Sequence, residues 1–144
     1  ERLTAAFGRF RIIYLEREDK LQQAISLTIA QQSGLWHRAA DGSELERIAP
    51  PSAPFYDRGK ILANLTDLTS QNAAWRAWFD QEDLAPHILK YEALAADPHG
   101  ELAKTLSALD LDPTAARNLP LPTSKLADAT NAAWAAKYRA ELTS

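Results

Sequence analysis

The stretch from Arg11 to Ser26 carries the strongest structural signal in this sequence. A short apolar run ends in charged residues, and an amphipathic helix pattern follows at once. This pattern predicts a buried parallel strand over residues 10–15 that leads into a helix. In open α/β sheets, phosphate-bearing ligands bind where strands end and helices begin. Arg17 lies at that edge and Ser26 about two turns into the helix, so we expect the two to converge on one phosphate.

Local signals define the helix that follows this strand. Asp19 is expected to cap its amino terminus, and Leu21, Ile25 and Ile29 form an apolar stripe at helical spacing. Gly34 is expected to end it.

The middle of the chain has a different character. Residues 35–57 contain three prolines and Gly42, and we expect a long irregular connection, of the kind that is often functional or mobile. Asp57 is expected to cap a long helix over residues 58–79. A second short apolar run, Ile88 to Tyr91, predicts another strand.

Helices are expected to dominate the remainder. The dipeptides Asp97-Pro98 and Asp112-Pro113 each predict a helix start, and a last helix is expected over residues 125–142. The order strand, helix, loop, helix, strand and three helices indicates an α/β protein. Because two strands make an insufficient parallel sheet, we expect its other strands to lie outside these residues.

Composition limits the classes of function. A chain of 144 residues with a net charge of −3 is expected to be one domain and not a nonspecific nucleic-acid binder. Without cysteine, it has no disulfide or thiolate metal site, and its three histidines lack metal-ligand spacing. No apolar run approaches the ~20 residues of a membrane span, and we expect a cytoplasmic protein. The chain begins at Glu1 and lacks methionine, so we interpret it as a fragment or a processed chain.

Several of these residues resemble one known family. Arg17-Glu18-Asp19-Lys20, Gln23-Ala24 and Ser26 are similar to the strand–turn–helix of sulfotransferases, in particular the bacterial trehalose-2-sulfotransferase-like family. The resemblance continues over residues 90–98 and, more weakly, over residues 128–139. It implies a P-loop-like parallel-sheet fold, of which this chain would be the helix-rich carboxyl-terminal portion of a single domain.

The resemblance also implies a reaction. Sulfotransferases move a sulfuryl group from 3′-phosphoadenosine 5′-phosphosulfate to a hydroxyl, here expected on a carbohydrate, and Arg17 and Ser26 would hold the donor's 3′-phosphate. The phosphosulfate loop and the catalytic base are expected upstream of Glu1. We therefore assign no catalytic residue and no metal to this chain, we expect it to be inactive alone, and His37 is the outside candidate for a base. A homodimer is kept as a candidate assembly.

Each candidate residue also has a structural interpretation. Arg17 could form a surface ion pair, and a serine within a helix often faces solvent or bonds to the preceding turn. Lys20 and Gln23 could shape the phosphate site, although a solvated Lys20 is the simpler expectation.

Two further pairs of neighbouring residues each have a functional and a structural interpretation. Trp36 and His37 could stack an acceptor sugar, but we favour an anchor that holds the loop to the core. Tyr91 and Glu92 are interpreted as structural residues that brace the sheet edge.

The chain departs from the family in two respects. It has no G-x-x-x-x-G-K-[ST] pattern or substitute. Near its end, Lys125 stands where the family places a basic residue followed by glutamine, ahead of Asp128 and Trp134. Trp75, Trp78 and Trp134 are expected in the core or an interface.

Two alternatives to a sulfotransferase stay open. One is a noncatalytic remnant or interaction module of this fold, and the other is a nucleotide- or sugar-kinase-like fragment.

Overall fold

The computed structural model describes residues 8, 10–120, 123–124 and 129–143, which form a mixed α/β arrangement. The described elements are, in order, β1 (Ile13–Glu16), α2 (Lys20–Ser33), β2 (Leu35–Ala39), β3 (Glu44–Arg47), α3 (Arg58–Gln81), β4 (His87–Lys90), α4 (Tyr91–Ala96), α5 (Pro98–Ala108), the 3₁₀ helix η1 (Pro113–Ala116), β5 (Thr123–Ser124) and α6 (Ala129–Ala140). Two compact units result: Glu1–Glu18 with Gln71–Pro120, and Asp19–Ser70 with Leu121–Ser144. The division falls inside α3.

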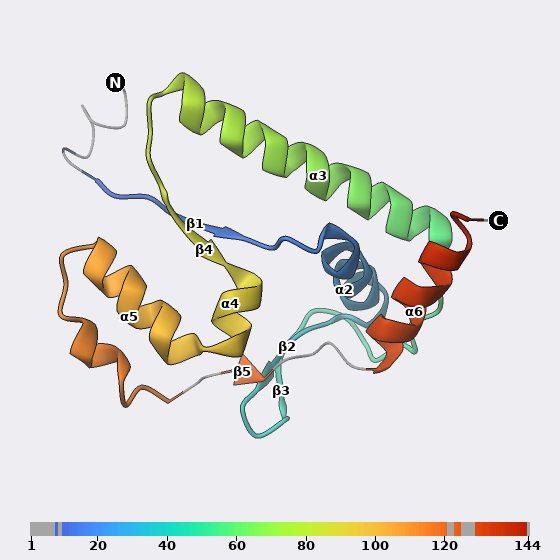
Figure 1. Ribbon diagram of the computed structural model, residues 1–144. Coiled ribbons are helices and arrows are strands. Elements are labelled where there is room, and N and C mark those ends of the chain that lie inside the picture. The colour runs from blue at the N-terminus through green and yellow to red at the C-terminus, as the bar shows by residue number, and fades with distance from the viewer. Residues whose placement is uncertain (1–7, 9, 121–122, 125–128, 144) are drawn as a thin grey trace. The chain divides into compact units, whose positions relative to one another are not determined.

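The first unit contains the two strands that the sequence predicts. β1 and β4 pair in parallel, with a register from Ile13 opposite His87 to Glu16 opposite Lys90 (Figure 1). The parallel pairing confirms the interpretation of the first apolar run, although pairing begins only at Ile13.

Helices of the same unit contact both strands of this sheet. The Tyr14 hydroxyl donates a hydrogen bond of 2.8 Å to Asn72 Oδ1 in the carboxyl-terminal part of α3, and its ring lies edge-on to Phe79 at 5.2 Å. On β4, His87 Nε2 lies 3.3 Å from the Thr105 hydroxyl of α5. These contacts fix the sheet against two helices.

The second unit has a core made by α2, α6 and the amino-terminal part of α3. Its buried members are Ala24, Ile25, Ile61, Ala135 and Tyr138. Leu21 and Ile29 pack against them, which confirms the predicted apolar stripe of α2.

Helix ends follow the local chemistry that the sequence indicates. Asp19 Oδ1 accepts the Gln22 N–H at 2.9 Å, and Asp57, Asp97 and Asp112 accept backbone N–H groups in the same way at the starts of α3, α5 and η1. At the end of α2, Gly34 adopts a left-handed φ of 72°. These four caps and the glycine stop were all predicted.

The prediction of an irregular connection over residues 35–57 is wrong in its first half. β2 and β3 form an antiparallel hairpin, and β5 pairs with the other edge of β2. The turn between β2 and β3 contains Asp41, which accepts the Ser43 N–H at 2.9 Å, and Gly42 with a φ of 85°. β3 is almost entirely exposed, so it lacks the apolar alternation by which a strand is recognised.

Two other boundaries differ from the prediction. Tyr91 begins α4 and does not end β4, because the apolar run continues into a short helix without a break signal. The last helix is described over Ala129–Ala140, and residues 125–128, including Lys125 and Asp128, lie outside the described residues.

Candidate functional site

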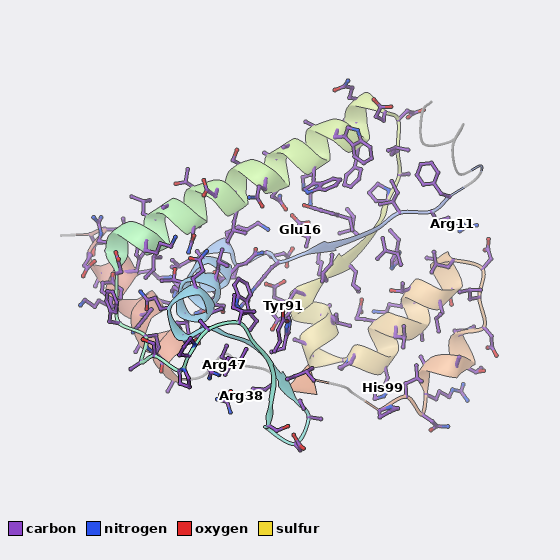
Figure 2. All side chains as sticks on the ribbon, turned by 180° about the vertical axis from the view of Figure 1, so that it is seen from behind. Arg11, Glu16, Arg38, Arg47, Tyr91 and His99 are labelled. Carbon is purple, nitrogen blue, oxygen red and sulfur yellow. The ribbon has the colours of Figure 1, made fainter. Side chains whose placement is uncertain are left out.

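The turn after β1 holds Arg17 in a defined setting within the first unit. Its guanidinium carbon lies over the ring of Tyr91, 4.5 Å from the ring centroid, which is a cation–π contact. The Glu18 N–H is within 3.1 Å of both carboxylate oxygens of Glu92, and Lys90 Nζ donates to Glu18 at 2.6 Å. These contacts support the interpretation of Tyr91 and Glu92 as residues that brace the strand edge. Figure 2 labels Tyr91, the first residue of α4.

A charged cavity of about 400 Å³ lies beside the carboxyl ends of β1 and β4. It is lined by Glu16, Glu18, Arg76, Ile88, Lys90, Ala93 and Glu101. Glu16 is buried at 8% exposure, and Arg76 Nη2 donates to its Oε2 at 2.5 Å. This hydrogen bond raises the pKa of Arg76. With three carboxylates against two cations, the cavity itself offers polar contacts but no net attraction for an anion.

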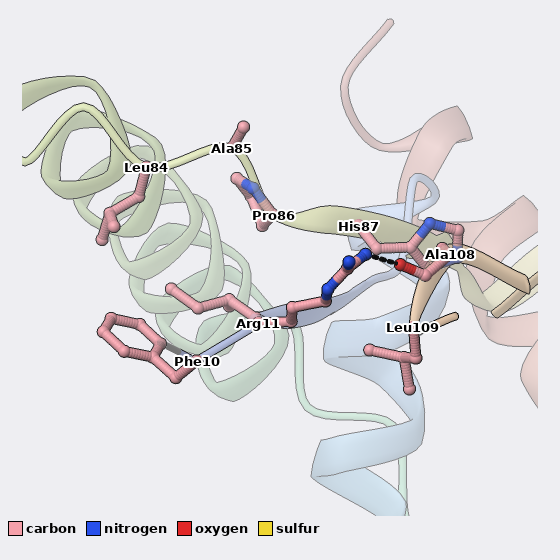
Figure 3. A pocket seen from close by; sticks show the side chains of 9 residues that line it. Phe10, Arg11, Leu84, Ala85, Pro86, His87, Ala108 and Leu109 are labelled. Carbon is pink, nitrogen blue, oxygen red and sulfur yellow. Dashed lines mark hydrogen bonds between the residues drawn. The ribbon is translucent and has the colours of Figure 1, made fainter. Parts of the chain in front are cut away.

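A second cavity of about 400 Å³ in the first unit lies at the other ends of the strands (Figure 3). It is lined by Phe10, Arg11, Ile12, Leu84, Ala85, Pro86, His87, Ala108 and Leu109. Arg11 is held there by the Ala108 carbonyl and the Asp110 carboxylate. Because ligands of open α/β sheets bind at the carboxyl ends of strands, this cavity is at the wrong edge for the predicted phosphate site.

Ser26 lies on α2 in the second unit and is partly buried. Its Oγ accepts a hydrogen bond of 3.0 Å from Asn131 Nδ2, which comes from α6. The serine therefore does not simply face solvent: a buried amide from another helix holds it in place.

The first turn of α2 carries the two polar residues that could shape a phosphate site. Lys20 Nζ lies 3.4 Å from Gln23 Oε1. The capping Asp19 also has Arg139 Nη2 at 3.7 Å from its carboxylate. Arg139 of α6 thus lies near the amino terminus of α2, and both belong to the second unit.

Arg17 and Ser26 fall into different units, on either side of the division between Glu18 and Asp19. Their convergence on a single phosphate therefore stays a prediction. Each residue by itself has the setting that such a role needs: a stacked guanidinium at a strand end, and a hydroxyl on the next helix that a neighbouring amide positions.

Trp36 and His37 lie on β2, not in a loop. His37 Nδ1 is 2.5 Å from Glu46 Oε2 on the paired strand, so the histidine joins the two strands of the hairpin. Trp36 is partly buried, and its indole Nε1 is buried without a hydrogen-bond partner among the described residues. Because the side chains of His37 and Glu46 are both more than half exposed, their contact joins the hairpin strands to each other and does not hold them to the core.

The other histidines make structural contacts in the first unit. His87 faces Thr105, and His99 Nε2 lies 2.9 Å from the Leu119 carbonyl. Within the part of the chain that the structure describes, no group of three histidine, aspartate or glutamate residues could hold a metal ion.

The tryptophans outside the hairpin contact other aromatic side chains, but Trp75 is 52% exposed, so the expected core position is wrong for Trp75 within its unit. Trp134 packs edge-on against Tyr56 at 5.8 Å in the second unit. Trp75 and Trp78 are 5.6 Å apart in the first unit, and both also contact Phe79.

Sequence reasoning missed Asn131, although a signal for it exists. Asn131, Ala135 and Tyr138 follow helical spacing on α6 and are all buried. A polar residue on the buried stripe of a helix needs a hydrogen-bond partner, and that requirement could have directed attention to a hydroxyl on a facing helix.

Among the helices in the described ranges, none is both long and apolar enough to cross a membrane.

Comparison with known protein families places this chain in one of them. The family profile described as Stf0 sulphotransferase matches residues 1–141. The chain therefore belongs to the Stf0 sulphotransferase family.

Two curated relatives, which share one name, align with most of this chain. A trehalose 2-sulfotransferase of Mycobacterium tuberculosis is 29% identical over 130 residues, which are 90% of this chain and 45% of that protein. A trehalose 2-sulfotransferase of Mycolicibacterium smegmatis is 30% identical over 129 residues, 89% of this chain and 45% of that protein. The chain thus spans less than half the length of these relatives.

Proposed function

We propose that the full-length protein containing this chain is a sulfotransferase that moves a sulfuryl group from 3′-phosphoadenosine 5′-phosphosulfate to a carbohydrate hydroxyl. The observation that carries the proposal is the turn from β1 to α2, where Arg17 stacks on Tyr91 at the carboxyl end of a parallel strand. The family match supports it over nearly the whole chain. In this proposal, Arg17 and Ser26 bind the 3′-phosphate.

The chemistry assigned to these residues is binding and orientation. A guanidinium presents its N–H groups in one plane, which suits the oxygens of a phosphate dianion. A fixed donor substrate places its sulfuryl group for in-line attack, and positioning of this kind lowers the barrier of a transfer reaction. No catalytic base is proposed within residues 1–144.

The exposed sheet supports the proposal that β1 and β4 belong to a larger parallel sheet. Ile13 and Leu15 on β1 are 44% and 55% exposed, and Ile88 on β4 is 43% exposed. Parallel sheets are normally covered on both faces. We propose that strands of the same domain, preceding Glu1, pair with or cover these residues and carry the phosphosulfate loop.

The acceptor is proposed from the relatives. Both have trehalose 2-sulfotransferase as their named activity, so trehalose is the first sugar to try.

Binding of the donor product is the direct test of the site. Calorimetry on the full-length protein should show tighter binding of adenosine 3′,5′-bisphosphate than of adenosine 5′-monophosphate, which lacks the 3′-phosphate. Equal affinity for the two nucleotides would remove the phosphate site from the proposal.

A further inference from the structure

Two buried asparagines donate hydrogen bonds to hydroxyls on α2, and Asn64 also donates to Gln31 Oε1 at 3.2 Å. Asn64 is 4% exposed and Asn131 is 5% exposed. Asn64 Nδ2 donates to Thr28 Oγ1 at 2.9 Å, and Asn131 Nδ2 donates to Ser26 Oγ at 3.0 Å. Both pairs lie within the second unit.

The Thr28 hydroxyl is fully used inside the protein. It accepts from Asn64 and donates its own proton to the Ala24 carbonyl at 2.8 Å. A hydroxyl has one proton to donate, so Thr28 has no donor left for a ligand. This pair is a closed structural contact between α2 and α3.

The Ser26 hydroxyl is used only as an acceptor among the described residues. It receives the Asn131 amide proton, and within the described chain it has no acceptor for its own proton. A serine in a helix usually donates to the carbonyl of the preceding turn, as Thr28 does. The Ser26 hydroxyl proton is therefore available for an acceptor that is not among the described residues.

We propose that Asn131 is a positioning residue that sets the Ser26 hydroxyl as a hydrogen-bond donor toward an anionic oxygen, here the donor nucleotide's 3′-phosphate. This inference rests on the proposed function. Asn131 acts through Ser26 and does not touch the ligand. Because it is buried on the same face of α6 as Ala135 and Tyr138, the packing of the helix fixes its position relative to α2.

The test measures a ratio: the affinity for adenosine 3′,5′-bisphosphate divided by the affinity for adenosine 5′-monophosphate, by calorimetry on the full-length protein. Ser26→Ala should lower the ratio about tenfold or more, as expected for one hydrogen bond to a charged group. Asn131→Ala should lower it in the same direction, and adding Asn131→Ala to Ser26→Ala should change it no further.

Asn64→Ala is the matched control. It removes an equally buried amide from the closed pair with Thr28, so it should lower the thermal midpoint while leaving the ratio at the wild-type value. Asn131→Asp is the second variant in case Asn131→Ala does not fold: it keeps the size of the side chain but accepts the Ser26 proton, so the ratio should also fall.

The outcomes separate the inference from the proposed function. A wild-type ratio of one would overturn both. A high wild-type ratio that falls in Ser26→Ala but persists in the folded Asn131 variants would overturn the inference alone. A further fall when Asn131→Ala is added to Ser26→Ala would show that Asn131 acts independently of the serine, and would also overturn it.

Discussion

Arg17 is the residue on which the proposed donor site most depends. Its guanidinium lies over the ring of Tyr91 just after β1, and this cation–π contact favours a position near the ring. Arg17→Ala should weaken binding of adenosine 3′,5′-bisphosphate by roughly 2–5 kcal/mol, the range for losing one partner of a buried charge pair. Arg17→Lys should recover only part of this, because an ammonium lacks the planar fork.

Arg11 provides the control for this prediction. It belongs to the same unit but lies before β1, where the Ala108 carbonyl and the Asp110 carboxylate hold it. Arg11→Ala should leave nucleotide affinity unchanged in calorimetry. Equal losses in the Arg11 and Arg17 variants would point to general destabilisation or to the overall charge, and not to a phosphate site.

Because of Tyr56, the free energy of unfolding is expected to fall at alkaline pH. Burial, followed by the hydrogen bond of 2.8 Å to Glu141, raises the pKa of Tyr56 to about 12. The unfolded chain binds this proton less tightly, since its tyrosine pKa is about 10. The stabilisation is therefore complete below about pH 10 and is lost as pH rises through about 12.

Urea unfolding at a series of pH values checks this prediction. The wild-type protein should lose free energy of unfolding between about pH 10 and about pH 12, and Tyr56→Phe should lose less over the same interval because it has no proton to release. Parallel curves for the two proteins would contradict the assigned role of Tyr56.

Among the elements, the junction of α2 with the hairpin depends on a glycine. Gly34 has a φ of 72°, and a Cβ there would lie 2.7 Å from Ala49 Cβ and 2.8 Å from the Ala49 carbonyl oxygen. Gly34→Ala should therefore destabilise the protein by more than the left-handed strain of about 1–2 kcal/mol, because Ala49 must also move.

Gly42→Ala is the matched control for this comparison. Its φ is 85°, but no atom lies within 4 Å of the added Cβ, so only the backbone strain applies. Thermal unfolding should rank wild type above Gly42→Ala, and Gly42→Ala above Gly34→Ala. Equal losses in the two variants would mean that the close approach of Ala49 has no energetic consequence.

Because of the hairpin, amide hydrogen exchange is expected to differ within residues 35–57. β2 and β3 are paired, whereas the amides of Ser52 and Ala53 have no hydrogen-bond partner in the described part of the chain. Hydrogen exchange should therefore be slower in β2 than at these two amides. Uniformly fast exchange across all these residues would contradict the hairpin.

Acceptor contact is a separate prediction for the same segment. We expect residues 35–57 to lie over the acceptor side of the site, with Trp36 as a stacking platform. Protection that increases when donor product and acceptor are added to the full-length protein would support this. Unchanged protection, together with unchanged acceptor kinetics in Trp36→Ala, would contradict it.

The elements that sequence predicted are those with strong local chemistry. Asp19 and Asp57 accept backbone N–H groups where helices begin, and Gly34 has the left-handed conformation that ends one. The hairpin was missed because exposed polar strands carry no alternating apolar signal, and β5 because its two residues are too few to form a pattern.

Part of the candidate site could also be predicted from the sequence. Arg17 and Ser26 followed from their place after an apolar run and from a family resemblance. Asn131 did not, because its role depends on how α6 packs against α2, a contact between residues 105 positions apart in the sequence. Sequence patterns indicate faces of helices, but not which faces meet.

For the whole molecule, we predict that residues 1–144 alone do not transfer sulfate. This chain lacks a phosphosulfate-loop pattern, and it spans 45% of each curated relative. The purified chain should show no transfer to a sugar in the assay described next. Turnover by these residues alone would require a base within them, and His37→Ala would then be the first variant to examine.

Sulfate transfer by the full-length protein is the direct test of the proposed activity. The measurement follows radiolabelled sulfate from 3′-phosphoadenosine 5′-phosphosulfate into trehalose and a panel of other sugars. The proposed function predicts labelled sugar with the wild-type protein and a large loss of label with Arg17→Ala, while Arg11→Ala retains it. A folded full-length protein that transfers no label to any sugar would contradict the proposed activity, and an Arg17→Ala variant with wild-type transfer would contradict the proposed role of Arg17.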